Sequence, residues 1–187
     1  MAVRAKGREE AAALLQKHTA LFADIPLASA SEVLRLRAAA TPLHPFFLID
    51  VRTAEERAVS MIPGAISAAA FERLCDEQPE TVARGICVPY CTIGFRSGVY
   101  CRRLQHASVP PAKVLNGEGV VLWSHDVGAF EGGTRRVHCY GKEWEVAAEG
   151  FETVVFNQTQ QLAKLPALVS SIVAWLRSWL CPCVKGS

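Results

Sequence analysis

The sequence predicts an α/β protein whose five-stranded, mostly parallel sheet carries helices on both faces. Short apolar runs alternate along the chain with segments of helical pattern, and this alternation is typical of parallel sheets. The run FFLIDV at residues 46–51 is almost continuously apolar, as expected for a strand that is covered on both faces. With 187 residues, the chain is long enough to form one such domain and to carry extensions at its ends.

Composition narrows the class of function. The net charge is only +2, so we expect no nucleic-acid partner. The seven cysteines are odd in number and follow no regular framework, which favours free thiols in a reducing, cytoplasmic compartment. No Cys-x-x-Cys pair has a matching second pair, and we therefore predict no metal site.

Residues 1–24 are expected to form a helical extension that packs on the domain. The run EEAAALLQKHTALF suits a helix that places Leu15 and His18 on one side. The acidic pair Glu9 and Glu10 is unusual in a transit peptide. A cleaved organelle-targeting segment remains the alternative for this stretch.

The domain itself begins with a strand expected at residues 25–28. Ser29 and Glu32 then form the pattern of a capping box, which predicts the start of a helix. The elements expected after the strand at 46–51 are a short helix at 53–60, a strand at 65–70, a helix at 71–83 interrupted at Pro79, a strand at 86–90, a helix at 97–106 and a strand at 113–115. Pro89 is unusual in a central strand, because proline cannot donate a backbone hydrogen bond.

Two charged residues follow the strand at 46–51. Asp50 and Arg52 stand at its carboxyl end, which is where open α/β sheets place their functional sites. We expect Asp50 to anchor loops by accepting hydrogen bonds, because a carboxylate beside a thiolate would repel it. Arg52 is expected either to pair with Glu55 or Glu56 or to orient the neighbouring loop.

Cys91 is the main candidate for chemistry. It lies between the apolar run ICVPY and a segment of helical pattern, in a short loop that contains Gly94 and Arg96. Backbone N–H groups of such a loop converge on one point, and the helix N-terminus adds partial positive charge. These influences favour a thiolate, which is the nucleophilic form of cysteine. The alternative is a small core residue beside a turn.

Two segments carry a resemblance to a known family. The loop CTIGFRS at residues 91–97 and the segment FLIDVRTAEERAVSMIPGA at residues 47–65 resemble, in the same order, the two signatures of the rhodanese-like sulfurtransferases. The resemblance covers residues 25–133 and implies the rhodanese-like fold. The chain departs from the family pattern at Ser60-Met61, where Gly-His is common, and at Glu118-Gly119, where a glycine pair is usual.

The resemblance implies that Cys91 is the nucleophile of a thiosulfate sulfurtransferase. In this family the cysteine takes sulfane sulfur from a donor as a persulfide and passes it to a thiol or a cyanide-like acceptor, without a cofactor. The substrate-binding residues it implies are Thr92, Ile93, Gly94, Phe95, Arg96 and Ser97, with Asp50 and Arg52 in support. The loop N–H groups would hold the anionic persulfide, and Arg96 would attract the anionic donor.

Other functions remain as alternatives. Related phosphatases and arsenate reductases carry five residues between the cysteine and the arginine, whereas four separate Cys91 from Arg96, so the loop length favours sulfur over a phosphate-sized group. A catalytically inactive binding or scaffold module of the same fold is the alternative outside enzymology.

The carboxyl-terminal part divides into two further segments. Residues 134–160 are expected to form an extension, in which His138 and Cys139 have a structural role. Residues 161–187 are expected to form an amphipathic helix and tail, because apolar residues recur at helical spacing from 165 to 180. We expect this helix to dock on the domain or another chain, or to lie in a membrane interface.

Overall fold

The computed structural model describes residues 2–141 and 144–156, with side chains from Gly7 onward. The chain divides into two compact units, residues 1–155 and 156–187, and the elements below belong to the first. The helices are α1 (Ala2–Thr19), α2 (Ala30–Ala38), α3 (Ala54–Val59), α4 (Ala68–Glu77), α5 (Pro79–Ala83), α6 (Phe95–Gln105) and α7 (Val120–Asp126), with the 3-10 turns η1 (Ala20–Phe22) and η2 (Glu131–Gly133). The strands are β1 (Leu27–Ala28), β2 (Phe46–Asp50), β3 (Ile66–Ser67), β4 (Ile86–Tyr90), β5 (Lys113–Val114), β6 (Asn116–Gly117), β7 (Arg136–Cys139) and β8 (Glu152–Val155).

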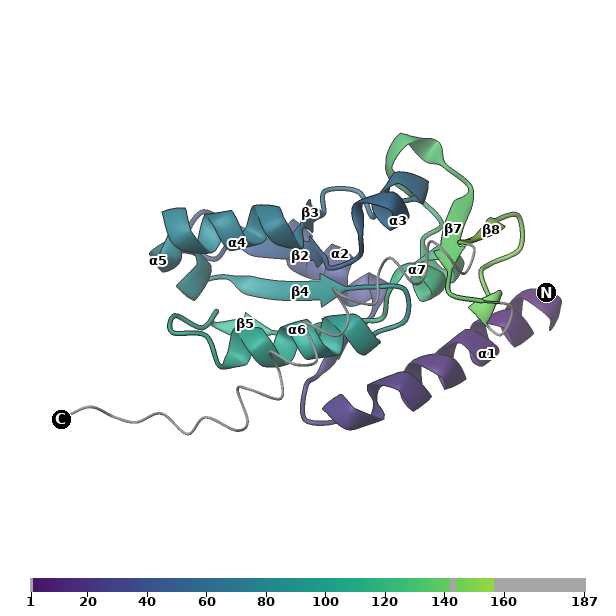
Figure 1. The fold of residues 1–187 in the computed structure, drawn as a ribbon, viewed down its shortest axis with the longest axis horizontal. Coiled ribbons are helices and arrows are strands. Elements are labelled where there is room, and N and C mark those ends of the chain that lie inside the picture. Colours follow the sequence, from purple (N-terminus) through teal and green to yellow (C-terminus); the bar gives the residue numbers. More distant parts are fainter. Residues whose placement is uncertain (1, 142–143, 157–187) are drawn as a thin grey trace. The chain divides into compact units, whose positions relative to one another are not determined.

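The α/β fold class predicted from the sequence is confirmed. A four-stranded sheet has the order β3-β2-β4-β5, and each neighbouring pair is parallel. The first predicted strand, expected at 25–28, is β1, and it pairs in parallel with β6 in a separate two-stranded sheet. Strand β6 follows β5 after a single residue. Helices lie along the sheet in Figure 1, where β4 occupies the centre. The amphipathic helix expected at 161–187 lies outside the described residues.

The third strand is shorter than the sequence predicted. A strand was expected at 65–70, but β3 contains only Ile66 and Ser67. The Ser67 side chain accepts a hydrogen bond from the backbone N–H of Ala70 and caps α4. The expectation was wrong because this N-cap starts the helix at once, and N-cap hydrogen bonds satisfy donors that a helix leaves unpaired.

Two apolar clusters cover opposite faces of the sheet. Side chains alternate along a strand, so Leu48 of β2 joins a cluster with α2 and α7, while Ile49 joins a cluster with α4 and α6. Val88 and Cys87 of β4 divide in the same way, and both are fully buried. Burial on both faces explains why these strands read as continuous apolar runs.

Pro89 lies inside β4 opposite Ile49 of β2. Strand β5 pairs with only the first two residues of β4, Ile86 and Cys87. Pro89 stands beyond that short ladder, so its lack of an N–H group removes no hydrogen bond to β5. A proline is therefore tolerated at this position of β4, because only the first two residues of β4 pair with β5.

The segments on either side of the predicted domain also pack in the first unit. Helix α1 contacts α6 and α7, and β7 contacts α3 and α7. Strands β7 and β8 form a parallel two-stranded sheet. Within the part of the chain described here, we find no helix long and apolar enough to cross a membrane.

Candidate functional site

The site lies at the carboxyl ends of two neighbouring parallel strands. Strand β2 ends at Asp50 and β4 ends at Tyr90, and these two residues are partners in the ladder. Cys91 follows Tyr90 directly, so Asp50 and Cys91 stand at the same edge of the sheet. This edge is the usual location of functional sites in open α/β folds.

The Cys91 loop curls so that polar hydrogens reach the cysteine sulfur. The backbone N–H of Gly94 donates to Cys91 Sγ at 3.1 Å, and the Ser97 hydroxyl donates to it at 3.5 Å. Gly94 has φ +90° and forms the N-cap of α6, a conformation that glycine adopts without the penalty of a side chain. The helix N-terminus and the turn thus both direct partial positive charge at the sulfur.

Carbonyl oxygens of the loop are held from outside. The first two residues of α7, Val120 and Val121, donate N–H groups to the carbonyls of Cys91 and Thr92 at 3.1 and 3.3 Å. The buried amide of Asn116 donates to the Gly94 carbonyl at 2.9 Å. Because these carbonyls accept hydrogen bonds from residues outside the loop, the N–H groups of the loop can point toward its inside, as the Gly94 N–H does.

The other predicted loop residues contribute backbone more than side chain. Ile93 is 1% exposed and belongs to the apolar cluster that contains α2 and α7, and Phe95 packs edge-on against Phe22 with ring centroids 5.8 Å apart. The Thr92 hydroxyl lies 3.4 Å from an Arg96 nitrogen. Among the predicted loop residues, Gly94 and Ser97 are the ones that donate hydrogen bonds to the cysteine sulfur.

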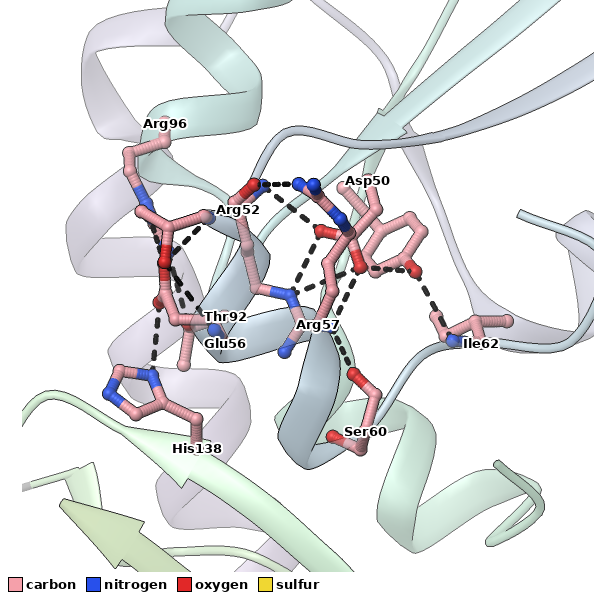
Figure 2. A network of polar contacts seen from close by, with 11 residues as sticks. Asp50, Arg52, Glu56, Arg57, Ser60, Ile62, Thr92, Arg96 and His138 are labelled. Atoms are coloured by element: carbon pink, nitrogen blue, oxygen red, sulfur yellow. Dashed lines mark hydrogen bonds and ion pairs between the residues drawn. The ribbon is translucent and has the colours of Figure 1, made fainter. Parts of the chain in front are cut away.

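Asp50 and Arg52 form a buried ion pair at the end of β2. Arg52 donates two side-chain nitrogens to the carboxylate, the shortest contact being 2.7 Å, and its backbone N–H adds a third bond. Asp50 also accepts from the Tyr90 hydroxyl at 2.7 Å, and Arg52 reaches the Ser60 carbonyl at 2.5 Å. Both charged side chains are fully buried, so this pair fixes the loop after β2 (Figure 2).

Arg96 pairs with Glu56 of α3, a partner that the sequence analysis had considered for Arg52. Both guanidinium nitrogens of Arg96 donate to the Glu56 carboxylate at 2.8 Å. Glu56 is fully buried and also closes the capping box of α3 with Thr53. The positive charge of Arg96 is therefore balanced within the protein, and the pair ties the Cys91 loop to α3.

His138 of β7 completes this second network. Its Nδ1 lies 3.0 Å from Glu56 Oε1, and both residues are buried (Figure 2). Burial alone would raise the pKa of Glu56, but hydrogen bonds from His138 and Arg96 outweigh it and hold this pKa well below its usual range. The carboxylate is thus charged at neutral pH and joins three separate segments of the chain.

Tyr140 was also missed in the sequence analysis, which assigned no chemistry to residues 134–160. Its ring lies 4.9 Å from the Arg96 guanidinium, in cation–π geometry. Burial raises the pKa of Tyr140, and the Arg96 cation opposes this effect. The spacing of His138 and Tyr140 was the available signal, because side chains two residues apart in extended backbone share one face and Tyr140 directly follows β7.

The other described cysteines show no sign of reactivity. Burial raises the pKa of Cys75, Cys87 and Cys101, and it raises the pKa of Cys139 to about 12. Thiols with raised pKa values are poor nucleophiles near neutral pH. No group of three or more metal-ligating side chains occurs in residues 2–141 and 144–156.

Comparisons with known proteins support the fold. No protein-family model matches the chain, and no curated protein matches it significantly. A thiosulfate sulfurtransferase from Pseudomonas aeruginosa is similar in structure, with a TM-score of 0.51 and 20% sequence identity over 83% of this chain. The chain spans only 26% of that protein. A protein of unknown function from Rhodopseudomonas palustris, described as a possible tyrosine phosphatase, gives a TM-score of 0.40 at 23% identity, covering 58% of this chain and 83% of its own.

Proposed function

We propose that this chain is a sulfurtransferase that carries sulfane sulfur on Cys91. The observation that carries the proposal is the contact of the Gly94 N–H with Cys91 Sγ at 3.1 Å, in a loop that opens directly into α6. Oriented backbone donors stabilise an anionic sulfur before and after transfer. The Pseudomonas protein of similar fold is a thiosulfate sulfurtransferase, which supports the same class of reaction.

The proposed reaction has two displacements. The Cys91 thiolate attacks the outer sulfur of thiosulfate, the bond between the two donor sulfurs breaks, and sulfite leaves with the electron pair. Cys91 then holds a persulfide, whose terminal sulfur is anionic. A thiol or cyanide-like acceptor attacks that sulfur, and the Cys91 thiolate is restored. This covalent route divides one transfer into two steps and needs no cofactor.

The contribution of Arg96 follows from its ion pair. Because Glu56 balances its charge, Arg96 supplies less attraction to an anionic donor than an unpaired arginine would. We propose that Arg96 mainly holds the loop in shape, while the loop N–H groups and the α6 N-terminus bind the negative charge. Asp50 and Arg52 support the neighbouring loop without touching the sulfur.

A scaffold module is the second candidate, and one observation favours it. Cys91 is only 3% exposed, whereas a reacting sulfur must meet its substrates.

The loop between Cys91 and Arg96 contains four residues, and this length argues against a phosphatase or an arsenate reductase. We also propose that the protein is cytoplasmic and that residues 165–180 contact another protein or a membrane. Liposome flotation with and without residues 161–187 tests the membrane contact.

Intact-protein mass spectrometry after brief exposure to thiosulfate tests the proposed function. We expect the native chain to gain one sulfur atom and Cys91→Ser to gain none while keeping its circular dichroism spectrum. Incubation with cyanide should then remove the sulfur and release thiocyanate. A folded native chain that never gains sulfur would remove the enzymatic proposal and leave the scaffold module.

A further inference from the structure

Two segments outside the predicted domain cover the Cys91 loop. Thr92 and Ile93 are each 1% exposed, and Cys91 is 3% exposed. Helix α1 lies against the turn: a Cβ atom on Gly94 would stand 2.6 Å from Thr19 Cγ2 and 2.8 Å from Leu15 Cδ1. The amino-terminal helix is therefore in direct contact with the loop that holds the candidate nucleophile.

Aromatic rings continue the cover from the other side. The Tyr140 ring lies 4.9 Å from the guanidinium of Arg96, and an Arg96 nitrogen lies 3.4 Å from the hydroxyl of Thr92, so this ring lies against the loop that begins at Cys91. The Trp144 ring lies 6.0 Å from that of Tyr140 and 4.4 Å from that of His18, measured between centroids. His18 belongs to α1, which means that the rings connect β7 and the following segment to the helix.

We propose that Tyr140 and Trp144, held against α1 by His18, form an aromatic cover that determines which acceptors reach the Cys91 sulfur. The inference rests on the proposed function in taking Cys91 as the nucleophile. Small acceptors such as cyanide need only slight movement of the rings. A thiol carried on a large molecule requires the cover to separate from α1. The cover thus selects small-molecule acceptors over protein thiols.

Alkylation of Cys91 tests the cover without any need for sulfur transfer. Iodoacetamide serves as the small probe and a polyethylene-glycol maleimide as the large one, and peptide mass spectrometry reports the rate at each cysteine. The variants are Trp144→Ala and His18→Ala, and Lys17→Ala is the control, because Lys17 is exposed on the same helix. The buried residues Cys87, Cys101 and Cys139 report global unfolding.

We expect both cover variants to increase the rate with the large probe about three- to tenfold, the change that loss of one aromatic contact produces. The rate with iodoacetamide should change less, and Lys17→Ala should behave as the native chain. If both variants leave the ratio of the two rates unchanged, the cover does not select by size. If labelling rises equally at every buried cysteine in Trp144→Ala, that variant is unfolding and His18→Ala decides.

Acceptor selectivity then links the cover to the reaction. We expect His18→Ala to speed sulfur transfer from thiosulfate to a reduced thiol protein, such as thioredoxin, by more than it speeds transfer to cyanide. Equal effects on the two acceptors would overturn the selection by size. A chain that takes up no sulfur but shows the expected alkylation pattern would overturn the proposed function and leave the cover in place.

Discussion

Two buried ion pairs stand at the same edge of the sheet, and they differ in what they join. Asp50 and Arg52 are two residues apart, and their network holds the end of β2 and the turn at Ser60. Glu56 and Arg96 are forty residues apart, and His138 extends that pair to a third segment. The first pair gives a strand end its shape, whereas the second controls the position of the Cys91 loop.

The comparison teaches that burial of an ion pair does not by itself determine which segments the pair holds together. Replacing Asp50 should disturb the ends of β2 and β4 and the turn at Ser60, while replacing Glu56 removes the carboxylate that joins α3, the Cys91 loop and β7. Four changes separate these contributions, and they run from the largest expected effect to the smallest.

Asp50→Asn should cause the largest loss of stability. It leaves the fully buried guanidinium of Arg52 without its counter-charge, and breaking a buried pair costs about 3–5 kcal/mol. Urea denaturation measures the change in unfolding free energy. Glu149→Gln removes one negative charge from an exposed turn and serves as the control. A loss as small as that of the control would show that the pair contributes nothing net.

Glu56→Gln should cost about 2–3 kcal/mol, less than Asp50→Asn, because Arg96 retains 16% exposure and can recover some hydration. It should also change the pH dependence. The pKa of Glu56 is lowered in the fold from its ordinary 4.5, so its contribution is present above that value and is lost as pH falls below it. The difference between native and variant should therefore shrink on acidification. If the difference in unfolding free energy does not change with pH, the charge of Glu56 is not what stabilises the network.

Gly94→Ala should cost about 1–2 kcal/mol more than Gly132→Ala, because only the first crowds α1. Both glycines have positive φ, but a Cβ atom at Gly132 would meet nothing within 4 Å. The control thus carries the same backbone penalty without the clash. Thermal unfolding of the two variants measures the difference, and equal melting temperatures would mean that α1 does not press on the loop.

The smallest effect should come from Glu32→Ala. Its pair with Arg35 is at the surface of α2, where the arginine side chain is 64% exposed, and such exposed pairs contribute little to stability. The same urea titration used for Asp50→Asn provides the measurement. If the loss of unfolding free energy is close to that of Asp50→Asn, surface and buried ion pairs stabilise this protein to a similar extent.

The sequence predicted the elements around β2 and β4 because burial on both faces leaves a continuous apolar run. It also predicted Asp50 as an acceptor of hydrogen bonds, because a carboxylate beside a thiolate would repel it. The pairing of Glu56 with Arg96 and His138 could not be predicted from the sequence. These contacts depend on how α3, α6 and β7 pack together, and residue spacing along the chain gives no information on that packing.

Domain limits were harder to predict than elements. The limits at residues 24 and 133 followed the extent of the resemblance, and the limit at 160 followed the helical pattern of the segment after it. This division remains a prediction. The structure places residues 1–155 in one unit. Contacts between Gly94 and α1 and between Glu56 and β7 join both flanks to the loop, and apolar periodicity alone carries no information on such packing.

The contact between α1 and Gly94 bears on proteolytic maturation. Leu15 and Thr19 are buried against the loop, so a protease that cut after α1 would remove part of the wall around Cys91 along with the helix. If these residues served as a cleavable address, the processed chain would expose the Cys91 loop more than the unprocessed chain does.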